Sequence, residues 1–95
     1  MKAYWITRCQ VYNSDDYDKY IKLAGPAIMK HGGNFLVRGG DQIEVEGGVY
    51  ERTVLVEFSS LEQAKACYYS DDYQQALEHS KNSSNRHVVL VEGME

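Results

Sequence analysis

A strand pattern passes directly into a helix start in RTVLVEFSSLEQ, residues 52–63. Apolar side chains occupy every second position from Val54 to Phe58, and the positions between them are also largely apolar, which predicts a strand with two nearly buried faces. Ser60 and Gln63 then have the Ser-x-x-Gln spacing of a capping box, which marks the first turn of a helix. The chain therefore predicts a strand that is followed at once by a helix.

The flanking segments extend this pattern to an order of strand, helix, strand, strand, helix, strand. The expected strands combine β-branched and aromatic residues with two-residue alternation, and the expected helices have apolar stripes at helical spacing. Glycine pairs and short polar runs separate the elements. Strands are expected at residues 2–11, at 34–38 with an extended continuation at 42–45, at 52–58 and at 87–92, and helical patterns fill 17–31 and 61–77.

Both helical patterns are interrupted. Pro26 cannot donate a hydrogen bond to the carbonyl four residues back, and its ring crowds that carbonyl, so a kink or break is expected near residues 22–25. In the second pattern, Ser70-Asp71-Asp72 interrupts the apolar stripe and offers a new N-cap with carboxylates at the positive end of the helix dipole. Two segmented helices are therefore predicted.

This order of elements predicts an α+β, ferredoxin-like βαββαβ fold as a single domain over residues 1–95. In that fold an antiparallel four-stranded sheet carries both helices on one face. The strands are apolar on both alternations, so the face away from the helices needs cover, and the same face of a second subunit would supply it. A homodimer is therefore expected.

Charge and hydropathy argue against two classes of partner. The chain has 10 basic and 14 acidic residues, a net charge of −4, and its Lys and Arg are scattered, so nucleic acid is not an expected partner. No apolar run approaches the roughly 20 residues of a transmembrane helix, and a strand pattern begins where a signal segment would stand. Cys9 and Cys67 are far apart in the sequence and form no Cys-x-x-Cys pair. We therefore expect two buried free thiols in a reducing compartment rather than a disulfide or a metal site. The sequence thus predicts a cytoplasmic protein without membrane association.

Two charges inside apolar strands are the candidate catalytic residues. Arg38 and Glu57 each need a partner, because an unpaired buried charge costs several kcal/mol. If their strands are adjacent in a suitable register, the two side chains could pair at a cavity, where Arg38 would hold a carboxylate or enolate and Glu57 would act as acid or base. The alternative is a structural ion pair that fixes strand register or the dimer.

Aromatic residues and one histidine are the candidate ligand-binding residues. Tyr69 and Tyr73 flank the predicted break in the second helix and, with Trp5, could wall a pocket, although core packing is the commoner use of such residues. His31 could reach the mouth of a cavity, or cap the first helix. The histidines lack metal-ligand spacing and no glycine-rich phosphate motif occurs, so neither a metal nor a cofactor is expected.

Several blocks resemble one protein family. The chain resembles the domain-of-unknown-function 1330 family in AYWI (residues 3–6), GG (32–33), FLVRGG (35–40), VEFSSL (56–61) and YSDDY (69–73). The similarity implies the dimeric α/β-barrel superfamily, in which two ferredoxin-like subunits pack sheet to sheet and whose members include antibiotic-synthesis monooxygenases, muconolactone isomerase, chlorite dismutase-type haem proteins and stress-response proteins. The resemblance implies no catalytic residue, because this family has no settled activity.

The sequence leaves three functions open. The first is a cofactor-independent oxygenase or isomerase that acts on a small aromatic or carboxylate-bearing molecule. The second is a small-molecule-binding or stress-associated dimer without turnover. The third is a dimer whose polar core residues only set its register, so whether the protein is an enzyme stays open.

Overall fold

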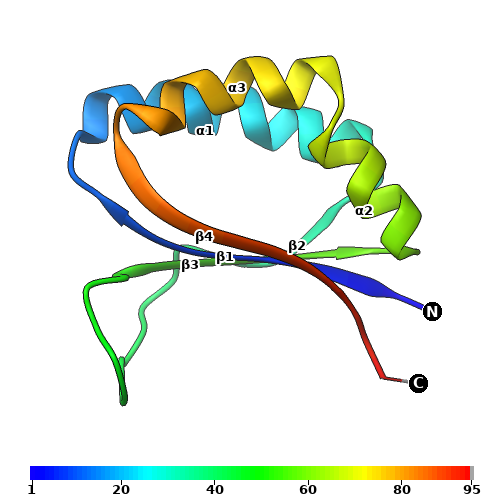
Figure 1. Ribbon diagram of the computed structural model, residues 1–95, viewed down its shortest axis with the longest axis horizontal. Coiled ribbons are helices and arrows are strands. Elements are labelled where there is room, and N and C mark those ends of the chain that lie inside the picture. Colours follow the sequence, from blue (N-terminus) through cyan, green and yellow to red (C-terminus); the bar gives the residue numbers. More distant parts are fainter. Residues whose placement is uncertain (95) are drawn as a thin grey trace.

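The computed structural model describes residues 1–94 and has the expected α+β architecture (Figure 1). All neighbouring strands of its four-stranded sheet are antiparallel, in the order β2-β3-β1-β4. This is the ferredoxin-like arrangement that the order of elements predicts. The elements are β1 (Ala3–Val11), α1 (Ser14–Lys30), β2 (Asn34–Arg38), β3 (Arg52–Phe58), α2 (Leu61–Tyr68), α3 (Asp71–Lys81) and β4 (Ser84–Glu92).

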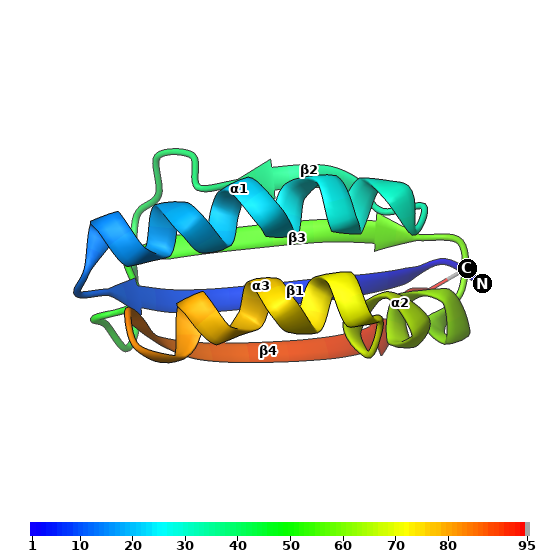
Figure 2. The same ribbon diagram turned by 90° about the horizontal axis from the view of Figure 1, so that it is seen from above.

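All three helices cover one face of the sheet (Figures 1 and 2). Seen from above, α1 runs along the β2–β3 side and α3 along the β1–β4 side, while α2 lies at one end of the sheet. The helices α1 and α3 pack against each other along their length. No helix in this described part of the chain is long and apolar enough to cross a membrane.

Side-chain caps set where the helices begin. The Ser60 hydroxyl accepts a hydrogen bond from the Gln63 backbone N–H at 3.1 Å, which forms half of the expected capping box. The Gln63 amide instead donates to the His31 carbonyl at 2.9 Å, so it ties α2 to the end of α1. Ser70 caps α3, which confirms the predicted break in the second helical segment.

The predicted break in the first helix is wrong, because α1 continues through Pro26 to Lys30. Residues on both sides of the proline, Ala24 and Ile28 among them, are buried against the core and hold the helix together. The carbonyl that loses its partner belongs to Lys22, which is exposed, so water can satisfy it.

Two strand boundaries also differ from expectation. Residues 42–45 belong to a loop, because Gly39 turns the chain at φ 72° and its N–H donates to the Thr53 carbonyl at 2.9 Å. At the other end of the chain, β4 begins at Ser84 rather than at His87. The longer β4 matters for the site, because it adds Arg86 to the strand.

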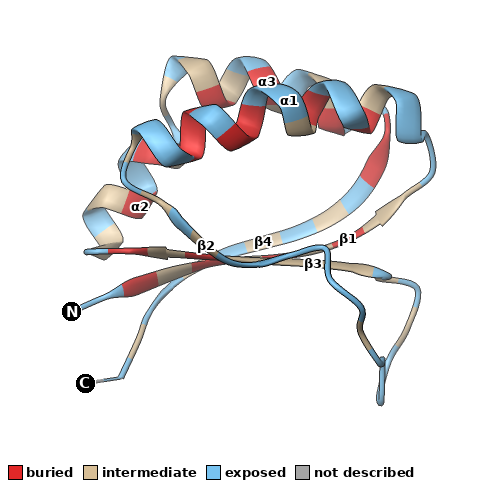
Figure 3. Cartoon of the chain, turned by 180° about the vertical axis from the view of Figure 1, so that it is seen from behind, coloured by how far each residue is buried: buried red, intermediate tan, exposed pale blue. Residues whose placement is uncertain are grey.

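Aromatic side chains fill the space between helices and sheet. The Trp5 ring stacks on Phe58 at a centroid distance of 6.2 Å and meets Tyr73 edge-on at 4.8 Å. All three side chains are at most 1% exposed, and they belong to one cluster of buried residues. Figure 3 shows that the buried residues of the helices lie on the side toward the sheet.

The other face of the sheet is not covered by helices, and its outer strands expose apolar side chains. Leu36, Val37, Val89 and Val91 lie on strands β2 and β4 and are each 40–53% exposed. The loop of residues 39–51 hangs from the sheet on the side away from the helices (Figure 1), and it carries further exposed apolar side chains. A single subunit thus exposes the apolar surface that the sequence predicts on this face.

Candidate functional site: an arginine-lined pocket

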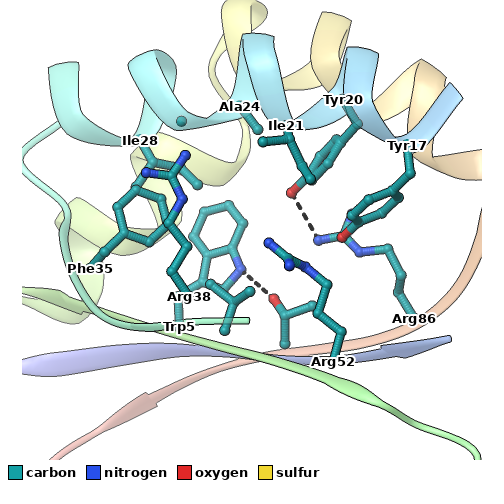
Figure 4. Close-up of a pocket in the computed structure, with 13 residues that line it drawn as sticks. Trp5, Tyr17, Tyr20, Ile21, Ala24, Ile28, Phe35, Arg38, Arg52 and Arg86 are labelled. Atoms are coloured by element: carbon teal, nitrogen blue, oxygen red, sulfur yellow. Dashed lines mark hydrogen bonds between the residues drawn. The ribbon is translucent and has the colours of Figure 1, made fainter. Parts of the chain in front are cut away.

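A narrow cavity lies between the helix-covered face of the sheet and α1 (Figure 4). Its volume is about 30 Å³, enough for a water molecule or two but too small for a ring while the side chains stay as they are. Aromatic and aliphatic groups form its walls, and three arginines enter it from three strands. The lining residues are Trp5, Thr7, Tyr17, Tyr20, Ile21, Ala24, Gly25, Ile28, Phe35, Arg38, Arg52, Val54 and Arg86.

Strand register places two of the arginines in one row across the sheet. Cys9 on β1 pairs with Arg52 on β3 and with Arg86 on β4. Cys9 is fully buried beneath the helices, and directly paired residues project to the same face of a sheet. Arg52 and Arg86 therefore flank Cys9 on the helix-covered face.

A β-bulge brings the third arginine to the same face. Phe35 pairs with Val56, but after a register shift Arg38 pairs with Val54, so both β2 residues lie on the helix-covered side. Without the bulge, Arg38 would project from the opposite face to Phe35, because the two residues are three positions apart. The bulge therefore adds Arg38 to the pocket.

Each arginine lies over an aromatic ring. The guanidinium carbon is 4.2 Å from the Phe35 ring centroid for Arg38, 5.9 Å from that of Tyr17 for Arg52, and 4.6 Å from that of Tyr20 for Arg86. Within residues 1–94, no Asp or Glu forms an ion pair with any of the three. The pocket thus holds three positive charges without a carboxylate of its own.

Arg86 is the most firmly held of the three. Its guanidinium donates to the Tyr20 hydroxyl at 2.9 Å, to the Ser80 hydroxyl at 3.2 Å and to the Tyr73 hydroxyl at 3.4 Å. The two tyrosine hydroxyls share a further hydrogen bond of 2.8 Å. Burial raises the pKa of both phenols, so both stay protonated at neutral pH and can donate hydrogen bonds.

Several donor groups in the pocket have no acceptor in the described chain. The Nε–H groups of Arg52 and Arg86 are buried without a hydrogen-bond partner. Thr7 accepts from the Trp5 indole at 3.0 Å, and its own hydroxyl proton remains available. Because guanidinium groups donate and never accept, this set of side chains suits a ligand that supplies acceptor oxygens and negative charge.

The structure does not pair Arg38 with Glu57. Glu57 pairs with Asn34 on β2 and with Tyr4 on β1, on the open face, and its carboxylate lies 3.5 Å from the Lys2 ammonium. The expected ion pair is therefore wrong. The bulge in β2 is the reason, since it moves Arg38 to the helix-covered face while Glu57 keeps the alternation of the open face.

The predicted ligand-binding residues lie in different places. Trp5 lines the pocket, and Tyr73 is buried directly behind it, bonded to Tyr20. Tyr69 is 66% exposed at the α2–α3 junction. It borders a shallow hollow whose lining residues do not include Arg38, so the expected cavity at the helix break is not the arginine-lined pocket.

His31 lies at the end of α1 and contacts α3 rather than the pocket. Its Nε2 is 3.2 Å from the Asp72 carboxylate. The pKa of Asp72 is lowered to about 2, first by its hydrogen bond with Ser70 and then by that with His31. His31 therefore fits its alternative role at the helix end better than a place at the mouth of the cavity.

Sequence reasoning missed Arg52 and Arg86, although a signal was present. Arg52 begins the alternation that continues through Val54 and Val56 on the buried face, and Arg86 begins the one that continues through Val88. A charge in phase with a buried stripe is a candidate for a site. Among the described residues, no cluster of three His, Cys, Asp or Glu side chains could hold a metal ion.

The fold and these strand registers define a ferredoxin-like α+β protein with an arginine-lined pocket between α1 and the sheet. Residues 2–94 match the family described as domain of unknown function DUF1330, and the chain belongs to this family. No curated protein matches the sequence.

Solved structures with low sequence identity share the fold. A protein of unknown function from Rhodopseudomonas palustris superposes with a TM-score of 0.81 at 12% identity, covering 99% of this chain and 83% of that one. A dimeric ferredoxin-like protein of unknown function from Jannaschia sp. has a TM-score of 0.74 at 14% identity, with 98% and 100% coverage. The cofactor-independent oxygenase SnoaB from Streptomyces nogalater has a TM-score of 0.67 at 9% identity, with 99% and 94% coverage.

Proposed function

We propose that this protein binds a small, ring-containing organic anion in the arginine-lined pocket. The observation that supports this proposal is the convergence of Arg38, Arg52 and Arg86 on one cavity without a carboxylate from the described chain. Arg52 and Arg86 are partly buried while Arg38 is exposed, and a bound anion would offset the free-energy cost of the partly buried charges. The aromatic rings of Trp5 and Phe35 supply flat walls for a planar ligand.

Cofactor-independent oxygenation is the reaction that we propose for this site. The arginines would stabilise an enolate or phenolate, and dioxygen would then oxidise an activated methylene carbon to a carbonyl. One oxygen atom becomes the carbonyl oxygen, and the other takes up the two methylene hydrogens and leaves as water. The fold shared with SnoaB is consistent with this chemistry, at fold level only. An isomerase has less support, because no carboxylate or imidazole among the described lining residues can carry a proton between carbons.

The same lack of a base favours binding without turnover as the second candidate. A substrate would have to ionise with help from the arginines alone, which restricts oxygenation to carbon acids that already lose a proton near neutral pH. A binding protein has no such requirement. Measurement of dioxygen consumption separates the two functions.

Binding can be followed by the fluorescence of Trp5, the single tryptophan of the chain and a wall of the pocket. Benzoate is expected to bind at least about tenfold more tightly than benzamide, its neutral counterpart, because only the anion neutralises the arginines. Arg52→Gln is expected to remove this preference, whereas Lys22→Gln, which changes an exposed charge on α1, is expected to keep it. Equal affinities of the wild-type protein for benzoate and benzamide would contradict the proposal.

An oxygen electrode then tests for catalysis, with the acidic, planar 1,3-indandione as substrate. Uptake of dioxygen that is lost in Arg52→Gln supports the oxygenase. Anion binding without uptake of dioxygen by this or other carbon acids leaves the binding protein as the function.

We further propose a homodimer that pairs the open sheet faces. The exposed apolar side chains on β2 and β4 and the dimeric state of the Jannaschia protein support this assembly. The loop of residues 39–51 extends on the same side and exposes Ile43 and Val45, at 88% and 86%, for contact with a second subunit. A cytoplasmic location stays a prediction, which suits the free thiols of Cys9 and Cys67.

Sedimentation velocity at micromolar concentration is expected to show a dimer. Val89→Asp is expected to shift it toward monomer, because a charge on the apolar surface of the open face loses its hydration on association. Leu23→Asp, which places the same charge on an exposed apolar position of α1, is the control and should leave the dimer intact. A wild-type monomer at these concentrations would contradict sheet-to-sheet pairing.

A further inference from the structure

We propose that the ligand of this pocket is a dianion, a ring with two anionic groups at opposite ends. One group would be held by Arg52 and Arg86 at the Tyr17–Tyr20 end, and the other by Arg38 at the Phe35 end. This inference rests on the proposed function, because it names the class of anion that the same pocket takes.

The charge balance is the first argument. A monoanion in the pocket leaves two of the three positive charges without a partner, whereas a dianion leaves one. Charges within a few ångströms interact by several kcal/mol where the effective dielectric constant is about 20, so the second negative charge adds substantially to affinity. The unpartnered Nε–H groups of Arg52 and Arg86 also call for more acceptor oxygens than the protein supplies.

The spacing of the arginines is the second argument. Arg86 and Arg38 stand on β4 and β2, the outer strands of the sheet, so their backbones are three strand spacings apart, roughly 14 Å. Figure 4 shows the Arg52 guanidinium on the Tyr17 side of the pocket and the Arg38 guanidinium beside Phe35 and Ile28. A ring with two acidic groups at opposite ends could contact Arg38 with one group and Arg86 with the other.

The two ends also differ in how firmly they are held. Three hydroxyl groups position the Arg86 guanidinium, while no described hydrogen bond or ion pair holds the exposed Arg38, which rests on the Phe35 ring. The Arg38 guanidinium lies against Gly25 of α1, where any Cβ atom would collide with it. We infer that Arg86 forms the fixed end and that Arg38 moves aside for the ring and closes on the second anionic group.

Isothermal titration of the full chain with benzamide, benzoate and the three benzenedicarboxylates tests this inference. The 1,3- or the 1,4-dicarboxylate, whose acidic groups are well separated, is expected to bind at least about tenfold more tightly than benzoate. Arg38→Gln is expected to bring that dicarboxylate to within about threefold of benzoate while benzoate itself changes little. Arg52→Gln is expected to weaken the binding of both the dicarboxylate and benzoate, whereas Lys22→Gln is expected to change neither affinity.

Gly25→Ala provides a second, independent variant. Alanine favours a helix over glycine, so the variant should fold, but its methyl group displaces the Arg38 guanidinium. The methyl group occupies the place against α1 to which the Arg38 guanidinium would return on closing, so the variant is expected to reduce dicarboxylate affinity more than benzoate affinity. If no dicarboxylate binds more tightly than benzoate while benzoate binds more tightly than benzamide, the dianion proposal is overturned and the proposal of anion binding stands. If no anion exceeds benzamide, the proposed function itself fails.

Discussion

Replacing Arg86 by methionine is expected to weaken benzoate binding by about 100-fold and to raise the free energy of unfolding by on the order of 1 kcal/mol. The first effect follows from the loss of the most firmly held cation in the pocket, where charge-assisted hydrogen bonds contribute about 2–5 kcal/mol. The second follows because methionine keeps the apolar stem while removing a partly buried charge that has no described carboxylate partner. Calorimetric titration and urea unfolding measure the two effects.

The variant is informative because it is expected to weaken ligand binding while it raises the free energy of unfolding. If Arg86 had a purely structural role, its removal would lower the free energy of unfolding, because Tyr20, Tyr73 and Ser80 would lose a common hydrogen-bond donor. Arg86→Lys serves as the matched control, because it keeps the charge but loses the planar fork that contacts several hydroxyl oxygens at once. Unchanged binding together with a clear loss of stability would show that Arg86 belongs to the core and not to a ligand site.

Replacing Trp5 by alanine is expected to lower the free energy of unfolding by about 3–5 kcal/mol. The indole is 1% exposed and touches Phe58, Tyr68 and Tyr73, so its removal leaves a cavity that rigid neighbouring rings cannot fill. Urea unfolding followed by circular dichroism measures the loss, since the variant has no tryptophan fluorescence.

Two further variants bracket that result. Trp5→Phe should cost less, because the remaining ring still packs against Tyr73, although the indole hydrogen bond to Thr7 disappears. Tyr12→Ala, at an aromatic residue that is 58% exposed, should change stability by less than about 0.5 kcal/mol. A comparable loss in Tyr12→Ala and Trp5→Ala would contradict the placement of Trp5 at the centre of the core.

The sequence predicted the fold because hydrophobic period and helix caps are local signals. The strand at 52–58 and the caps at Ser60 and Ser70 could be read from a few neighbouring residues each, and together they determine the order of elements. Pro26 shows the limit of local reasoning. Its intrinsic tendency to break a helix is overcome by core contacts made on both sides of it, which only the folded chain brings together.

The candidate site was harder to predict than the fold, because it depends on pairing between strands. Arg38 was singled out for its charge, but its partner was predicted wrongly since a one-residue bulge in β2 reverses the face on which it projects. Arg52 and Arg86 converge only because both pair with Cys9, a relation that no spacing along the chain expresses. Glu57 has the same kind of apolar neighbours as Arg38 and yet lies on the opposite face.

The alternation of the sheet also has an evolutionary consequence. Residues such as Arg52 and Val54 face the pocket, while the positions between them face the proposed partner, so neighbouring positions in one strand are subject to separate selection. A lineage could exchange pocket residues for a new ligand without disturbing the other surface, or alter assembly without losing its ligand. Chains that share this sheet can therefore diverge in chemistry while they keep one architecture, with each strand encoding two independent traits.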